Sequence, residues 1–257
     1  MKFCSKLYNL CFLINQISYK EQKRKINETN LGNFWNYLNP LLYMVILSTY
    51  YQNVIKHKID DYPVFVFVGV MLANYYINGT TGAMRSLLEN KELLIRTNVS
   101  FEVFVVQKIT TAFKEMLCSL ISLIPIMIYF SVEISYRIFV VIPLLFITTL
   151  VIWGLGEVLS IIYVFFADID YFYSILMTFA FLVSGTFMPI EYMPYNIQKI
   201  LSINPIFLSI YIGRNCLIYN LPSHWTAWVK LTVWAVLLFS LGRFLMIKNK
   251  NGIVGKM

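Results

Sequence analysis

The sequence predicts an all-α integral membrane protein with six transmembrane helices, and three observations lead to this prediction. Hydrophobic residues make up 58% of the 257 residues, and the mean hydropathy is +0.66. Charged residues make up 13%, well under the ~25% usual in soluble domains. Apolar stretches near the ~20 residues that a helix needs to cross a bilayer recur along the chain. We therefore expect residues 1–257 to form one transmembrane domain with no folded soluble domain beside it.

The first expected element is an amphipathic helix in residues 3–20, within a cytoplasmic segment at residues 1–30. Its polar side chains lie mostly on one side, and a basic cluster follows at residues 20–25. This pattern is typical of a helix that lies in the lipid headgroup layer, and an ordinary solvent-facing helix is the alternative. The apolar stripe is formed by Phe3, Leu7, Leu10, Ile14 and Ile17.

The six expected spans follow from the longer apolar runs and from the glycines, prolines and charges that separate them. Tyr50 and Tyr51 end the first run, where an aromatic belt at a membrane interface belongs. The third helix begins near Phe101 and is expected to enter the bilayer past Lys108. The spans are expected at about residues 34–54, 62–84, 101–131, 138–166, 171–187 and 225–246.

Between the last two spans, residues 189–214 are expected to form a re-entrant hairpin of two short helices. The two apolar runs here are too short to cross a bilayer, and helix-ending residues flank each of them. Broken backbone in lipid survives only where protein or water covers it. One irregular helix followed by a surface loop is the alternative. The residues that mark the hairpin are Pro189, Pro194, Pro205 and Arg214.

The distribution of basic residues predicts the orientation of the chain in the membrane. Most Lys and Arg residues outside the spans lie in residues 1–33, 85–103 and 243–257. Because basic residues favour the cytoplasmic side, both termini and the loop at residues 85–102 are expected there, and the hairpin is expected outside. Within this loop, residues 86–96 have the pattern of a short amphipathic helix. Such a helix suits either docking of a cytoplasmic partner or an interfacial loop, and periodicity alone leaves both open.

The sequence holds no motif of an enzyme active site. It has no G-x-x-x-x-G-K-[ST] phosphate loop, no H-E-x-x-H motif and no nucleophile elbow. The cysteines form no CxxC pair and the two histidines are isolated, which argues against a metal site. The net charge of +8 is typical of cytoplasmic loops in a membrane protein, so nucleic acid is not an expected partner. Energy for any transport is therefore expected to come from another subunit.

Two charged residues inside the spans, Lys114 and Glu157, are expected to pair. The third helix comes from the cytoplasm near Phe104, and the fourth span returns to the cytoplasm near Asp168. Lys114 and Glu157 then lie at similar depth, each about 15 Å of helical rise from that boundary. An unpaired charge at this depth is costly. The alternative is that Lys114 extends to the interface and Glu157 faces a wet cavity.

Several short motifs, in order along the chain, resemble one family of transport proteins. Residues 31–42 read LGNFWNYLNPLL, residues 93–96 read LLIR, and Asp168 follows the fourth span. Residues 185–194, then Asn204-Pro205 and Arg214, complete the series. The chain resembles the permease subunit of ABC-type exporters of bacterial cell-surface polysaccharide, which carry O-antigen, capsule or teichoic acid. It departs from the family pattern at Ala167, where the family has Arg, and near Phe101, where a proline is common.

The resemblance implies a function, partners and site residues. It implies a homodimer bound to two copies of a separate ATP-binding subunit, so that ATP and Mg²⁺ belong to the partner and this chain has no cofactor. It implies a lipid-linked glycan as substrate, a multi-pass location in the cytoplasmic (inner) membrane among its lipids, and an aromatic-lined channel. The channel candidates are Tyr43, Tyr50, Tyr75 and Tyr76. The candidates for coupling to the ATPase are Leu87, Glu89, Asn90, Leu93, Leu94, Arg96 and Asp168.

Three other functions compete with polysaccharide export. The main one is an ABC exporter of drugs or lipids built on the same permease fold. A membrane-embedded enzyme is disfavoured because the spans hold no cluster of carboxylates or histidines. An assembly scaffold without transport differs in one measurable respect, since it would not stimulate ATP hydrolysis by a partner.

Overall fold

The computed structural model describes residues 12–21, 23, 32–54, 61–96, 99–133 and 135–256, and every regular element within them is helical. The predicted all-α class is therefore confirmed. Residues 12–21 are helical, which agrees with the C-terminal half of the predicted amphipathic helix. Phe3, Leu7 and Leu10 lie outside the described residues.

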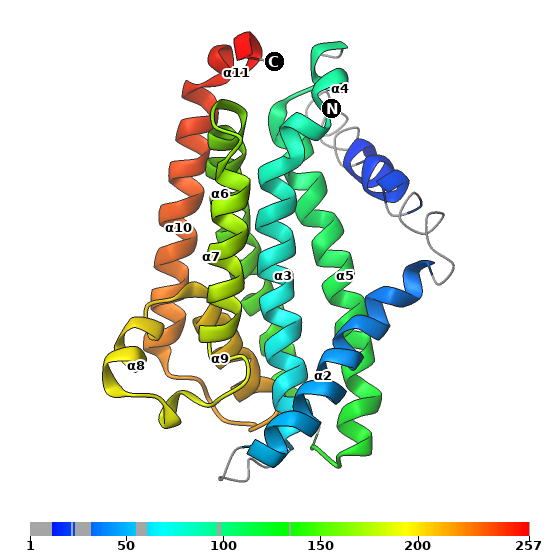
Figure 1. Cartoon of the computed structure of the whole chain (residues 1–257), viewed down its shortest axis with the longest axis vertical. Helices are drawn as coiled ribbons and strands as arrows, with labels where there is room; N and C mark the ends of the chain where they lie inside the picture. The colour runs from blue at the N-terminus through cyan, green and yellow to red at the C-terminus, as the bar shows by residue number, and fades with distance from the viewer. Residues whose placement is uncertain are drawn as a thin grey trace.

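Helix α3 (Tyr62–Glu89) is the centre of the bundle. It packs extensively on α5 (Phe101–Tyr129) and on α6 (Val141–Phe165), and α10 (Trp225–Lys248) packs on the other side of α6. The sequence explains this position, because residues 64–73 are apolar on every face and a helix that is hydrophobic all round is buried. Figure 1 shows α3 running the height of the molecule behind the tilted helix α2 (Trp35–Val54).

Four helices are long and apolar enough to span a membrane: α3, α5, α6 with the short helix η2 (Tyr136–Val140) before it, and α10. Helix α2 has 20 residues but carries polar residues such as Asn39. Helix α7 (Ile169–Val183) has 15 residues. The described chain thus has four candidate membrane spans by length and composition, whereas the count of six spans stays a prediction.

Two short helices, α8 (Tyr195–Leu201) and α9 (Pro205–Leu217), follow α7 and the short helix η3 (Ile190–Tyr192). They are bent by 93° at the break between them, which fits a re-entrant loop or a broken span. Asn204 begins α9 as its N-cap, and its Oδ1 accepts the Ile206 N–H at 2.9 Å. Pro205 occupies the first helical position, where the missing N–H costs nothing. The dipeptide Asn204-Pro205 therefore ends one helix and begins the next.

The bundle has two chemically different ends. Helix 12–21, α4 (Lys91–Arg96) and α11 (Lys250–Lys256) gather at one end, called here the α4 end (Figure 1). The other, called here the α9 end, contains α8, α9 and the beginning of α3 (Figure 1). Helix α9 is buried over most of its length against α3, α6 and α10. The functional residues fall into a group at each end.

Candidate functional site

Helices α6 and α10 approach closely at two glycines. A Cβ atom placed on Gly154 would overlap the backbone of α10 at Leu238 and Phe239. A Cβ atom on Gly242 would lie 2.6 Å from the carbonyl oxygen of Gly154. Neither position has room for a side chain, and small residues of this kind let the backbones of membrane helices meet. The contact places Arg243, the residue after Gly242, beside Glu157 of α6.

Glu157 is fully buried and is held by side chains of two helices. Its Oε1 accepts a hydrogen bond from Trp153 Nε1 at 2.9 Å and lies 3.2 Å from Arg243 Nη1. The same Arg243 nitrogen lies 2.7 Å from Glu102 Oε2, at the beginning of α5. Arg243 therefore connects α10 to both α6 and α5, and it supplies the partner that a buried carboxylate requires.

The predicted pairing of Lys114 with Glu157 is wrong. Lys114 Nζ lies instead 3.3 Å from both Asn15 Oδ1 and Ser18 Oγ of helix 12–21. The prediction matched depths on two consecutive helices, α5 and α6. These two helices each pack more closely on α3 than on each other. Near Glu157, α6 also contacts α10, which follows much later in the chain and supplies Arg243.

A second ionic group joins helix 12–21 to the bundle. Lys108 Nζ lies 2.6 Å from Glu21 Oε1 and 2.6 Å from Glu89 Oε2. Gln107 Nε2 donates to Glu21 Oε2 at 2.6 Å. Because Glu89 ends α3 just before α4, this group links the helix 12–21, the beginning of α5 and the loop that was predicted to couple to an ATPase.

The predicted coupling residues divide into buried and exposed members. Leu87 is fully buried and Leu94 is nearly so, so both pack inside the chain. Leu93 and Ile95 are exposed, at 46% and 63%. The apolar surface that α4 presents is therefore formed by Leu93 and Ile95, and the sequence pattern assigned Leu94 to the wrong side.

The remaining coupling residues lie close to this surface or at the start of α7. Glu89 contacts Lys108, and Asn90 Nδ2 donates to Ser86 O at 2.8 Å, while Arg96 is exposed. Asp168 is exposed as the N-cap of α7. The carboxylate that makes an ion pair there is Asp170, whose Oδ1 lies 2.8 Å from Arg85 Nη2. Sequence reasoning singled out Asp168 and missed Asp170.

At the α9 end, Arg214 binds backbone carbonyl groups from two other segments. Its guanidinium donates to Phe65 O of α3 at 3.0 and 3.1 Å, to Gly185 O at 2.6 Å and to Thr186 O at 2.6 Å. Only 5% of its surface is exposed, and its guanidinium carbon lies 3.3 Å from the centre of the Phe65 ring. Arg214 thus joins α9, α3 and the break after α7.

Two glycines make room for Arg214 and its partners. Gly185 has φ +72°, a conformation that other residues adopt at a cost, and it lets the chain turn after α7. A Cβ atom on Gly69 of α3 would overlap Arg214 Nη2 and lie 2.8 Å from Thr186 O. Tyr62 adds a further link, since its hydroxyl donates to Phe187 O at 2.9 Å.

The four tyrosines predicted to line a channel also divide in two. Tyr43 and Tyr50 of α2 are exposed, at 47% and 61%. Tyr75 and Tyr76 of α3 are buried among the helices of this chain, and the Tyr75 hydroxyl lies 2.6 Å from Thr149 Oγ1. Tyr43 and Tyr50 are therefore the two that lie at the surface.

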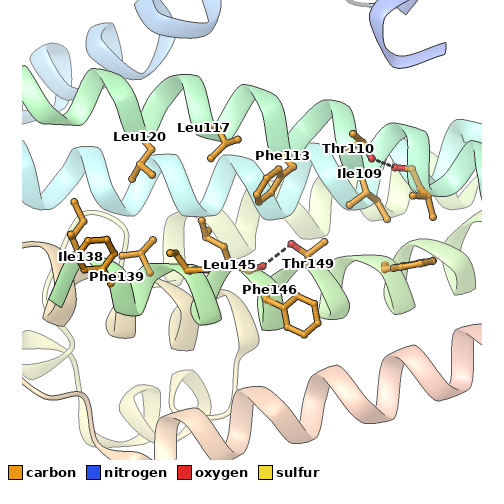
Figure 2. A pocket seen from close by; sticks show the side chains of 14 residues that line it. Ile109, Thr110, Phe113, Leu117, Leu120, Ile138, Phe139, Leu145, Phe146 and Thr149 are labelled. Atoms are coloured by element: carbon orange, nitrogen blue, oxygen red, sulfur yellow. Dashed lines mark hydrogen bonds between the residues drawn. The ribbon is translucent and has the colours of Figure 1, made fainter. Parts of the chain in front are cut away.

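An apolar groove of about 670 Å³ separates α5 from α6. Figure 2 shows side chains of α5, among them Phe113 and Leu117, facing Leu145 of α6 across it, and Phe146 of α6 also lines the groove. Its hydroxyl groups are bonded within the chain, as for Thr110 Oγ1 with Val106 O at 2.8 Å. The groove offers a surface for hydrocarbon rather than for polar groups.

The chain can now be compared with known proteins. A model of the ABC-2 type transporter family matches residues 13–218. The chain belongs to the ABC-2 type transporter family. It is 22% identical over 212 residues to the O-antigen export system permease protein RfbA of Klebsiella pneumoniae, covering 81% of this chain and 82% of that protein. It is 23% identical over 200 residues to the protein of the same name from Myxococcus xanthus, covering 74% of each chain.

These matches confirm the resemblance found in the sequence. The chain is a membrane-spanning transport subunit of the ABC-2 family, and its relatives include proteins named as O-antigen export permeases. Membership in this family implies an ATP-binding partner subunit.

Proposed function

We propose that this chain is the membrane subunit of an ATP-driven exporter that moves a lipid-linked cell-surface polysaccharide across the cytoplasmic membrane. The polymer would be an O-antigen, a capsule or a teichoic acid. The observation that carries the proposal is the similarity to O-antigen export permeases over 74–81% of the chain. An exporter of drugs or lipids is the alternative within the same family.

The working unit proposed is a homodimer bound to two copies of a separate ATP-binding subunit, which supplies ATP and Mg²⁺. Both termini and α4 face the cytoplasm in this arrangement, and the segment at residues 189–214 lies outside. The ATPase docks on the exposed side of α4, formed by Leu93 and Ile95. Movement there reaches the bundle through Glu89 and Lys108, which are 2.6 Å apart.

The proposed channel lies between the two copies, along the exposed faces of α2 and α7. Tyr43 and Tyr50 of α2 and Phe172 and Phe179 of α7 are all exposed, and Tyr43 contacts Phe181 edge to face with ring centres 6.4 Å apart. Aromatic faces of this kind suit stacking against sugar rings as well as contact with lipid.

Deletion of the gene tests the function. Loss of surface polysaccharide, with lipid-linked glycan accumulating inside the cell and recovery on complementation, is the expected result. Unchanged surface polysaccharide together with altered sensitivity to drugs would contradict glycan export and favour the alternative substrate.

Changing Leu93 and Ile95 to Asp tests the docking surface. These two substitutions should abolish co-purification of the ATPase and leave membrane insertion intact, because burying the new carboxylates in an interface is unfavourable. Alanine at Lys91 and Glu92, which are exposed on the same helix, is the matched control and should retain the complex. If the aspartate variant and the alanine variant co-purify equal amounts of ATPase, α4 is not the docking element.

A further inference from the structure

A small polar recess of about 80 Å³ lies where α2, α3 and α5 meet. Pro40, Met71, Tyr75, Ala112 and Met116 form part of its lining. Each helix also contributes a pair of residues four positions apart, which therefore lie on one helical face. The pairs are Trp35 and Asn39 of α2, Asn74 and Asn78 of α3, and Glu115 and Ser119 of α5. Polar side chains on three helices converge on one point, as expected for a binding site.

The recess lies near the middle of the bundle in depth. Glu115 is the fifteenth of the 29 residues of α5, so about 21 Å of helix separates it from either end. Asn74 and Asn78 lie in the middle third of α3. Asn78 and Asn39 are exposed on the surface of the single chain, and Glu115 is half-buried. Polar groups facing hydrocarbon at this depth are costly. We therefore expect polar groups of water, of a ligand or of a second copy of the chain to cover Asn39 and Asn78.

The other side of α5 has the opposite character. Phe113, Leu117 and Leu120 line the apolar groove toward α6 (Figure 2), where lipid chains are a suitable environment. The same helix thus presents hydrocarbon-like side chains to one side, and to the other the Glu115 carboxylate and the Ser119 hydroxyl, which donates to Glu115 O at 3.2 Å. This asymmetry favours a path for a hydrophilic molecule on the recess side of α5, where α2 borders both the recess and the proposed channel.

The composition of the recess favours a neutral, hydroxyl-rich ligand. An amide both donates and accepts hydrogen bonds, as a sugar hydroxyl does, and a carboxylate accepts them. The indole of Trp35 adds a ring face. Among the described residues that line the recess, the one charged group is the Glu115 carboxylate, and the neighbouring Lys114 reaches toward Asn15 and Ser18 instead. Phosphate, which requires positive charge or several donors, suits it poorly.

We propose that this recess binds the hydroxyl groups of one sugar unit at a time as a glycan passes through the membrane. The inference rests on the proposed function and identifies where the carbohydrate portion of the substrate, rather than its lipid, is contacted. The volume accommodates one edge of a sugar ring, with the rest of the ring in the open path. Asn74 and Asn78 supply the central contacts, and Glu115 and Asn39 flank them.

Site-specific photo-cross-linking in cells tests the contact. A benzophenone amino acid replaces Asn78 in the assembled exporter, and the glycan is labelled by feeding the cells a tritiated sugar. We expect tritium on the permease after irradiation. The matched control carries the same amino acid in place of Phe146, which lines the apolar groove and should give no tritiated product. Cross-links from position 78 to lipid alone, or within the chain alone, would overturn the proposal.

Rates of export provide the second measurement. Asn74→Ala with Asn78→Ala should lower the rate of glycan export about five- to thirtyfold, because two hydrogen bonds of ~1 kcal/mol are lost, while the yield of folded complex is unchanged. Leu117→Ala, on the other side of α5, should leave the rate within about twofold. An unchanged rate in the double variant, in cells where the wild type exports glycan, would overturn the inference and leave the proposed function standing. Absence of glycan export by the wild type would instead overturn the function itself.

Discussion

Two buried charged residues, Glu157 near the α4 end and Arg214 at the α9 end, are stabilised by different kinds of partner. Glu157 is fully buried and meets side chains, Trp153 Nε1 at 2.9 Å and Arg243 Nη1 at 3.2 Å. Arg214 is 5% exposed and donates to backbone carbonyls, at 2.6 to 3.1 Å. The buried charge near the α4 end is thus held by contacts between side chains. The buried charge at the α9 end is held by hydrogen bonds from a side chain to the backbone.

The difference has a mechanical consequence. Arg243 is already shared between Glu102 and Glu157, so a movement of α5 can change the balance of its two contacts without leaving Arg243 unpaired. The carbonyl groups of Gly185 and Thr186 lie outside the helices, and moving either of them away from Arg214 removes its hydrogen bond to this buried donor. Arg243 has two carboxylate partners, on α5 and α6, whereas Arg214 holds carbonyl groups of the backbone. We therefore expect the contacts at the α9 end to tolerate less movement than those of Arg243.

Arg214→Ala is expected to have the largest effect. It leaves the carbonyl groups of Gly185 and Thr186, which lie outside the helices, without this donor in a buried site, which costs about 1–3 kcal/mol for each. The carbonyl group of Phe65 keeps its bond within α3, so we expect a large but not complete loss of folded protein. Arg214→Lys should recover part of the loss, because an ammonium group reaches some of the carbonyls but lacks the planar fork. Thermal unfolding of the purified complex measures both.

Lys230→Ala is the matched control for Arg214. Lys230 also donates to a carbonyl group, Ser202 O at 3.1 Å, but at an exposed position where water replaces it. We expect the control to unfold at the wild-type temperature. Equal losses for Arg214→Ala and Lys230→Ala would refute the role assigned to buried carbonyl contacts.

Gly69→Ala tests the rigidity of the same end with a single methyl group. The new Cβ would overlap Arg214 Nη2 and lie 2.8 Å from Thr186 O, and this backbone group has little freedom to move. Overpacking of this kind costs about 1–3 kcal/mol. Gly82→Ala, also on α3, places its Cβ 3.6 Å from Lys108 Cβ, an ordinary contact. The Gly82 variant should be at least as stable as the wild type. If both variants lose stability to a similar extent, the loss comes from placing alanine in α3 and not from the contact with Arg214.

The sequence predicted the short helices around Arg214 better than it predicted the groups that Arg214 binds. Asn204-Pro205 is a local signal, and it correctly placed the helix break before α9. The fifth span was expected to reach residue 187, whereas α7 ends at Val183, before the turn at Gly185. The partners of Arg214 are carbonyl groups, which every residue has, so no pattern of side chains indicates which ones it binds. Its structural role required the three-dimensional arrangement of α3, α7 and α9.

The error at Glu157 has a different physical origin. Depth along a helix follows from counting residues, and the count placed Lys114 and Glu157 at similar depth. Which helices are neighbours follows instead from side-chain size at their contacts, here Gly154 and Gly242. Both glycines are visible in the sequence, and a small-residue contact between α6 and α10 was the signal available for finding Arg243.

A double-mutant cycle on Glu157 and Arg243 tests the exchangeable pair. Arg243→Gln should destabilise the protein more than Glu157→Gln, because it leaves a buried carboxylate without its cation. The double variant should be more stable than the sum of the two losses predicts, with a coupling of about 1–2 kcal/mol. If the loss of stability in the double variant, measured by thermal unfolding, equals the sum of the two single losses, the two charges do not interact.

The smallest effect is expected at Arg85 and Asp170, an ion pair at the same end of the molecule but nearer to solvent. Arg85 Nη2 lies 2.8 Å from Asp170 Oδ1, and the side chains are 42% and 20% exposed. This distance is shorter than that between Arg243 and Glu157, so geometry alone would rank this pair higher. Water competes for exposed charges, and such pairs contribute about 0–1 kcal/mol. The cycle of Arg85→Gln with Asp170→Asn should therefore give less coupling than the buried pair, and added salt should reduce it further. A coupling equal to that of Glu157 and Arg243 would mean that distance rather than burial sets the strength of the contacts at the α4 end.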